Sequence, residues 1–158
     1  MKTTAVISVD QLTGQGADWT PFVSMLQRFQ AWGYDGVELA VRDPARLDVA
    51  ALERALQPTR LPVAALATGT AYLIDGLSYT HPEAAIRRGT MQRVAEHCQL
   101  AARIGGRVII GLVRGRLQPG VAPAQARTWM KEGVAAAYEV GQRLGVNLLF
   151  EPINRYET

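Results

Sequence analysis

Short apolar runs alternate with amphipathic stretches from one end of the chain to the other. Five of these runs have the length and composition of buried β-strands: 4–9, 37–41, 61–67, 108–112 and 146–150. Between them, apolar residues recur at helical spacing. Strands that alternate with helices pair in parallel through right-handed crossovers. The pattern therefore predicts four βα units followed by a fifth strand.

Residues typical of helix starts indicate where the predicted helices begin. Thr20 fits an N-cap with proline at the first helical position, and Asp48 fits the cap of a short helix. Thr80 and Glu83 have the spacing of a capping box, and Pro123 begins the last helix. We expect a long loop between the end of the third strand and Thr80.

Two architectures fit this order of elements. An open, doubly wound sheet of five strands would be complete at 158 residues, whereas an eight-stranded barrel needs roughly 250. A doubly wound nucleotide-binding sheet should carry a glycine-rich phosphate turn after its first strand, but residues 10–16 match neither GxGxxG nor a Walker loop. We therefore expect an α/β fold of the (β/α)₈ TIM-barrel class. Residues 1–158 would be a single domain, the N-terminal part of a barrel: the first (βα)₄ plus strand five.

Composition and charge exclude several classes of function. The net charge is +3 and the basic residues are dispersed, so we expect no nucleic-acid binding. A single cysteine excludes an internal disulfide and a cysteine-based zinc site, and it suits a reducing compartment. No apolar run reaches about 18 residues and the first residues do not fit a signal peptide. We expect a cytoplasmic protein without membrane contact.

Glu151 is the strongest candidate for chemistry. It directly follows the fifth apolar run, and the carboxyl ends of barrel strands are where barrel enzymes hold their catalytic groups. A solvated glutamate at a strand end fits the residues alone equally well. Arg114 and Arg116 follow the fourth strand on the same side, where each is a candidate to bind a substrate carboxylate or part of a solvated basic loop.

Other polar residues carry weaker expectations. Glu38 interrupts an apolar strand, so it belongs either to a polar network inside the barrel or to the outer side against a helix, and a structural role is favoured. His81 is expected in a helix start and not as a metal ligand. His97 lies beside an apolar helical stripe and is expected at the surface or its boundary. Cys98 falls on that stripe and is expected to be a small buried hydrophobe.

Several segments carry a family resemblance. They are Gly-Tyr-Asp-Gly-Val-Glu-Leu at 33–39, Ala-Val-Arg-Asp-Pro at 40–44, the segment 69–82, Val-Ile-Ile-Gly-Leu-Val-Arg-Gly-Arg at 108–116 and the octet 151–158. Together, and over essentially the whole chain, they resemble the xylose-isomerase-like barrel superfamily of sugar isomerases and epimerases. Within it the sequence is most similar to the ketose 3-epimerase group, including 5-keto-L-gluconate epimerases.

The resemblance implies a divalent metal, Mn²⁺ or Mg²⁺, held by Glu, Asp, His and Glu from four strands of the second half of the barrel. Glu151 stands in the Glu-Pro-x-Asn-Arg motif of the first ligand, and Glu157 matches a substrate-contacting glutamate. Arg155 is expected to fix the loop. The other three ligands would lie beyond residue 158, so the chain resembles the N-terminal fragment of a longer, C-terminally truncated enzyme.

The family chemistry is epimerisation of ketoses or keto-sugar acids through a metal-stabilised enediolate, with two carboxylates exchanging the proton. Glu151 would be one of the pair, the substrate a small sugar or sugar acid, and the protein a homo-oligomer. The 158-residue chain alone is expected to be inactive. The alternative is a non-catalytic half-barrel whose open sheet edges make it self-associate or pair with a complementary half. An abasic-site endonuclease of the same superfamily is disfavoured, because the chain lacks a multiple-histidine set and a dense basic surface.

Overall fold

The computed structural model describes residues 2–10 and 18–154. Its strands are β1 (Thr4–Ser8), β2 (Gly36–Ala40), β3 (Val63–Ala67), β4 (Arg107–Ile110) and β5 (Leu148–Phe150). Its helices are α2 (Thr20–Ala31), α3 (Val49–Leu56), α4 (Gly69–Asp75), α5 (Ala84–Ile104) and α6 (Pro123–Leu144), with single 3₁₀ turns η1 (Pro44–Arg46) and η2 (Leu112–Arg114). All five predicted strands are therefore present, and β5 is shorter than expected.

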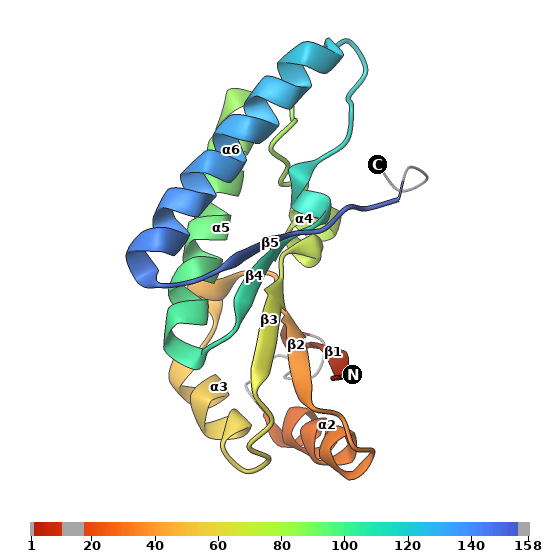
Figure 1. Ribbon diagram of the computed structural model, residues 1–158, viewed down its shortest axis with the longest axis vertical. Coiled ribbons are helices and arrows are strands. Elements are labelled where there is room, and N and C mark those ends of the chain that lie inside the picture. The colour runs from red at the N-terminus through yellow and green to blue at the C-terminus, as the bar shows by residue number, and fades with distance from the viewer. Residues whose placement is uncertain (1, 11–17, 155–158) are drawn as a thin grey trace.

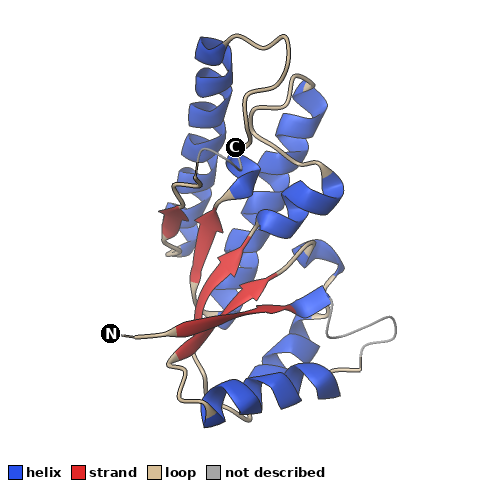
Figure 2. Ribbon diagram, turned by 90° about the vertical axis from the view of Figure 1, so that its right-hand side faces the viewer, coloured by secondary structure: helices blue, strands red, loops and turns tan. Residues whose placement is uncertain are grey.

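The order of the strands distinguishes between the two architectures. The sheet runs β1-β2-β3-β4-β5, every neighbouring pair is parallel, and the strands twist relative to one another across the sheet (Figures 1 and 2). A doubly wound sheet reverses its strand order part-way and carries helices on both faces. Here the chain always moves to the next position in the same direction. This is the winding of a (β/α) barrel, and the chain contributes five of its strands.

The two faces of the sheet differ sharply in burial. One face is covered by the helices and forms the core, and its central row runs across the sheet as Ile7, Leu39, Leu66 and Val108, none more than 3% exposed. The opposite face is the inner side of the barrel wall. There Val6 is 62% exposed and Leu149 43% exposed, because among the described residues no element covers them. The inner face is thus open in this chain.

Helices α5 and α6 lie side by side along one end of the sheet (Figure 1). Gly133 of α6 packs against the loop that precedes α5, where a Cβ at this position would overlap the ring of the buried Tyr79, with Cε1 at 2.7 Å. The absence of a side chain in α6 therefore makes room for the Tyr79 ring, the largest fully buried side chain in the described part of the fold.

His97 joins α5 to the end of β2, and the prediction that it lies at the surface is wrong. The ring is fully buried, with Nδ1 2.8 Å from the Arg93 carbonyl oxygen and Nε2 2.8 Å from the Val41 carbonyl oxygen. One turn away, Arg93 donates to the Arg42 carbonyl oxygen at 2.6 Å. Burial of the polar ring is compatible with these contacts, since each ring nitrogen lies within hydrogen-bonding distance of a backbone carbonyl oxygen.

Some predicted helix starts are also wrong. Thr20 is the first residue of α2 and not its cap; instead the Asp18 carboxylate accepts from the Thr20 amide at 2.9 Å. No capping box forms at Thr80 and Glu83, since the Thr80 hydroxyl donates to a distant loop and α5 begins at Ala84. The Asp48 cap is confirmed, with its Oδ1 accepting from the Ala51 amide at 2.9 Å. The expected long loop after β3 contains α4.

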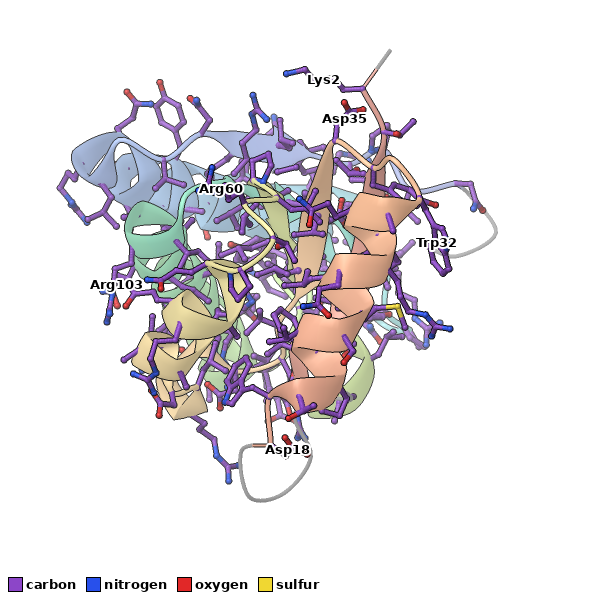
Figure 3. All side chains as sticks on the ribbon, turned by 90° about the horizontal axis from the view of Figure 1, so that it is seen from below. Lys2, Asp18, Trp32, Asp35, Arg60 and Arg103 are labelled. Carbon is purple, nitrogen blue, oxygen red and sulfur yellow. The ribbon has the colours of Figure 1, made fainter. Side chains whose placement is uncertain are left out.

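At the amino ends of the strands, the turn between α2 and β2 contacts the start of β1. Asp35 accepts from the Thr3 amide at 2.7 Å and so holds the start of β1 (Figure 3). Trp32, at the end of α2, projects into solvent and is 62% exposed. None of the helices in residues 2–10 and 18–154 is long and apolar enough to span a membrane.

Candidate active site at the carboxyl end of the sheet

Glu151 lies at the carboxyl end of β5, on the inner side of the barrel wall. Its amide donates to the Ile110 carbonyl oxygen at 3.1 Å, which extends the pairing of β5 with β4 by one residue. The side chain lies over Gly111, where a Cβ would collide with the carboxylate. A glycine after β4 therefore leaves the space that the Glu151 carboxylate occupies.

Glu38 is a second carboxylate on the inner face. It comes from the middle of β2, between Val6 and Ala65 in the register of the sheet, and is half-buried. Burial raises the pKa of Glu38, and the negative charge of Glu151 raises it further. Of the two positions left open by the sequence, the inner face is therefore the correct one for Glu38.

Arg114 lies beside the segment that carries Glu151. It ends the turn η2 after β4, its Nη2 donates to the Ile153 carbonyl oxygen at 3.2 Å, and its guanidinium carbon is 6.0 Å from the centre of the Phe150 ring. These contacts connect the β4 and β5 ends of the sheet. Arg114 thus contacts residues on both sides of Glu151, the ring of Phe150 and the carbonyl oxygen of Ile153.

Arg116 is exposed and lies further along the same loop. The loop is fixed by the Thr80 hydroxyl, which donates to the Arg116 carbonyl oxygen at 2.7 Å. Gly115, with φ of +84°, is needed at this point because the Ser78 and Thr80 hydroxyls approach so closely that a Cβ would overlap them. The structure therefore places Arg114 and Arg116 on one rigid loop at the rim of the barrel.

The remaining candidate residues are Glu157, Arg155, His81 and Cys98. Glu157 and Arg155 lie outside the described residues. His81 accepts from the Glu83 amide through Nδ1 at 3.1 Å, in the turn that leads into α5. Cys98 is fully buried, as predicted, and burial raises the pKa of its thiol to about 11. Neither His81 nor Cys98 lies among the carboxylates of the inner face.

The inner face offers part of a divalent-cation site. Mn²⁺ and Mg²⁺ prefer carboxylate oxygens, and Glu151 offers one at a barrel position open to solvent. No group of three or more His, Cys, Asp or Glu side chains that could hold a metal occurs within residues 2–10 and 18–154. The described residues thus fit one ligand of such a site and not a complete set.

Comparison with known protein families gives a match over most of the chain. The profile of the xylose isomerase-like TIM barrel family matches residues 26–158. The chain belongs to this family. No curated protein matches the sequence.

Several solved epimerase structures share the fold of the chain. It is similar to D-allulose 3-epimerase from Methylomonas sp. in complex with D-allulose, with 24% identity, a TM-score of 0.74, and coverage of 99% of this chain and 54% of that one. An L-ribulose 3-epimerase gives 22% identity and a TM-score of 0.75 over 98% of this chain and 51% of that one. A 3-keto-D-glucoside 4-epimerase from E. coli gives 18% identity and a TM-score of 0.69 over 98% and 57%. The chain spans about half the length of these structures, and at these identities the likeness shows the fold alone.

Two residues that shape the site were missed in the sequence. Gly111 falls within a predicted apolar strand, although a glycine at a strand end signals a close approach of other atoms. Arg127 falls within a predicted helix, yet it lines the same pocket as Arg114 and Arg116. Its position one turn into α6, the helix that follows the arginine loop, was the available signal.

Proposed function

We propose that the whole protein is a divalent-metal-dependent epimerase or isomerase of ketoses or keto-sugar acids, and that Glu151 is one of its acid/base groups and a metal ligand. The observation that carries the proposal is the position of the Glu151 carboxylate at the carboxyl end of β5, on the inner side of a xylose isomerase-like barrel wall. A bound Mn²⁺ or Mg²⁺ would stabilise the negative charge that develops on the substrate oxygens.

Glu151 performs the proton transfer on one face of the substrate. Its carboxylate accepts the proton from the carbon next to the substrate carbonyl, and the carboxylic acid so formed returns a proton in the reverse direction. Inversion requires a second proton donor on the opposite face of the sugar. The glycine at 111 leaves the Glu151 carboxylate free to approach the substrate.

The other candidate residues have binding roles in this proposal. Glu157 contacts the substrate, and Arg114 and Arg116 bind an acidic group of it at the rim of the barrel. The protein works in the cytoplasm as a homo-oligomer, on a small sugar or sugar acid, without nucleic-acid or membrane partners. The ketose substrates of the similar structures, D-allulose and L-ribulose, are the first compounds to assay.

The test is turnover of these ketoses and of a keto-sugar acid by the whole protein, with Mn²⁺, with Mg²⁺ and with chelator. Glu151→Gln keeps the size and hydrogen-bonding capacity of the side chain but cannot accept the proton, so turnover should fall by at least about a hundredfold. Glu139→Gln, an exposed change on α6, is the matched control and should leave turnover unchanged. Wild-type turnover by Glu151→Gln would reject the role of Glu151.

A second candidate concerns the 158-residue chain by itself. The edge strands β1 and β5 each have one neighbour among the described residues, and Val6, Leu149 and Phe150 expose apolar surface beside them. An unpaired strand edge promotes association with another chain. As a half-barrel, the chain would self-associate or pair with a complementary half without catalysing a reaction.

Sedimentation velocity of the isolated chain distinguishes the second candidate. Leu149→Lys places a charge at the open face and should shift the chain toward monomer. Tyr138→Lys, at an exposed position on α6, is the control and should not. A wild-type chain that stays monomeric at high concentration would reject self-association.

A further inference from the structure

Three arginines from two elements meet in one pocket at the rim of the barrel. The pocket has a volume of about 300 Å³ and lies between the loop after β4 and the first turns of α6. Arg114 and Arg116 come from the loop and Arg127 from α6, while Leu117 and Met130 form an apolar wall. None of the described residues that line the pocket is acidic.

The gathering of arginines without an acidic residue distinguishes this pocket from the ion-pair network elsewhere in the fold. There, Arg103 pairs with Glu53, and Arg93 contacts three acidic side chains. The guanidinium groups of Arg116 and Arg127 have no acidic partner within the described part of the chain. Like charges gathered around one pocket raise the free energy of the folded protein unless an anion neutralises them.

The backbone that carries the pocket is held in place by contacts within the chain. The hydrogen bond from Thr80 to the Arg116 carbonyl oxygen and the close packing at Gly115 hold the loop against the turn before α5. The other wall is the start of a 22-residue helix whose first turn has no side-chain cap, so its free amides add positive potential. Guanidinium groups held in place bind phosphate and carboxylate groups through paired, charge-assisted hydrogen bonds.

Arg114 connects this pocket to the candidate active site. It lines the pocket and also donates to the Ile153 carbonyl oxygen, two residues after Glu151. A sugar whose reacting carbon lies at Glu151 would therefore extend toward the arginines at its other end. An anionic group at that end would pair with the guanidinium groups, whereas a neutral hydroxyl would leave the charges of Arg116 and Arg127 in place.

We propose that the pocket of Arg114, Arg116 and Arg127 binds the phosphate or carboxylate group of the substrate, so that the protein prefers anionic sugars to neutral ketoses. This inference rests on the proposed function, which it makes more specific. Phosphate and carboxylate share the required chemistry, a compact anion with several acceptor oxygens. Sugar phosphates and keto-sugar acids are thus the two substrate classes to compare.

The first experiment measures the pocket without catalysis. Inorganic phosphate is titrated into the wild-type protein and into Arg116→Gln/Arg127→Gln by isothermal calorimetry. We expect the double variant to bind phosphate at least about tenfold more weakly, because two charge-assisted contacts are lost. Arg143→Gln, an exposed arginine in the last turn of α6, is the matched control and should keep wild-type affinity. Equal phosphate affinity in the wild type and the double variant would overturn the site.

The second experiment compares a sugar phosphate, a keto-sugar acid and a neutral ketose as substrates of the whole protein. The double variant should raise the KM of an anionic substrate at least about tenfold and leave that of a neutral ketose unchanged. Unchanged KM for both anionic classes would overturn the substrate assignment. Loss of phosphate binding in the double variant together with full turnover by Glu151→Gln would reject the proposed function and leave the anion site in place.

Discussion

The carboxyl groups of Glu38 and Glu151 interact across the inner face of the barrel wall, although their strands, β2 and β5, are separated by two others. Burial is the larger cause of the raised pKa of Glu38, and the charge of Glu151 adds to it. The two carboxylates share the inner face with small residues such as Ala65 and Ala67. The inner face of the barrel wall thus carries acidic side chains, whereas the loop after β4 carries basic ones.

Glu38→Gln should stabilise the protein at neutral pH in the presence of chelator. Since the pKa of Glu38 in the folded state is raised above its ordinary 4.5, the folded state binds more protons, and the free energy of unfolding falls as pH rises from 4.5 through the folded pKa. Glutamine does not ionise, so the variant does not lose stability as the pH rises. Urea unfolding at pH 4 and pH 7.5 should therefore show a gain only at the higher pH. An equal effect at both pH values would contradict the electrostatic explanation.

His97→Gln should remove a pH dependence of opposite sign. Burial lowers the pKa of His97 below its ordinary 6.5, although its two carbonyl contacts act in the opposite direction. The unfolded state then binds more protons below pH 6.5, so the wild type loses stability as pH falls below that value. At pH 8 the variant should be less stable by about 1–3 kcal/mol, because a buried carbonyl loses its partner. Parallel pH profiles of the two proteins, measured by chemical unfolding, would contradict this account.

Gly133→Ala should destabilise the fold by about 1–3 kcal/mol, because the new methyl group overlaps the ring of Tyr79 in the loop before α5. The matched control is Gly89→Ala in the interior of α5, where the new Cβ makes an ordinary contact of 3.5 Å with Leu77. Alanine there should stabilise by about 0.5–1 kcal/mol through helix propensity. Thermal unfolding of the two variants should therefore shift in opposite directions, and shifts of the same sign would reject the role given to Gly133.

Cys98 should react with thiol reagents only when the protein unfolds. The side chain is fully buried and its pKa is raised to about 11, so both access and thiolate are lacking near pH 8. Labelling with an aromatic disulfide reagent should be slow in buffer and should accelerate in parallel with the urea unfolding transition. Fast labelling of the folded chain would show that α5 opens locally.

The strands and their parallel pairing could be predicted because each strand buries a continuous apolar run against helices. The position of Glu151 could be predicted for the same reason, since the last apolar residue of a strand places the next side chain at the mouth of the sheet. The helix starts were less predictable, because Thr20 and Thr80 have capping chemistry but other groups, Asp18 and a distant carbonyl, make the competing hydrogen bonds.

Burial of His97 could not be predicted from its neighbours in the sequence. It depends on the Val41 carbonyl oxygen, which is 56 positions away along the chain and needs a donor only because β2 ends there. The meeting of Arg127 with Arg114 and Arg116 likewise depends on the path of a loop, which the Thr80 hydrogen bond and Gly115 determine. Long-range hydrogen bonds, not local spacing, thus position both features.

Isotope exchange in the whole protein tests the role of Glu151 most directly. When a ketose or keto-sugar acid substrate is incubated in D₂O with Mn²⁺, proton abstraction next to the carbonyl exchanges the substrate hydrogen for deuterium, which NMR detects without any need for net turnover. The wild type and Glu139→Gln should exchange at equal rates, and Glu151→Gln should show exchange reduced by at least about a hundredfold. Exchange by Glu151→Gln at the wild-type rate would contradict the account.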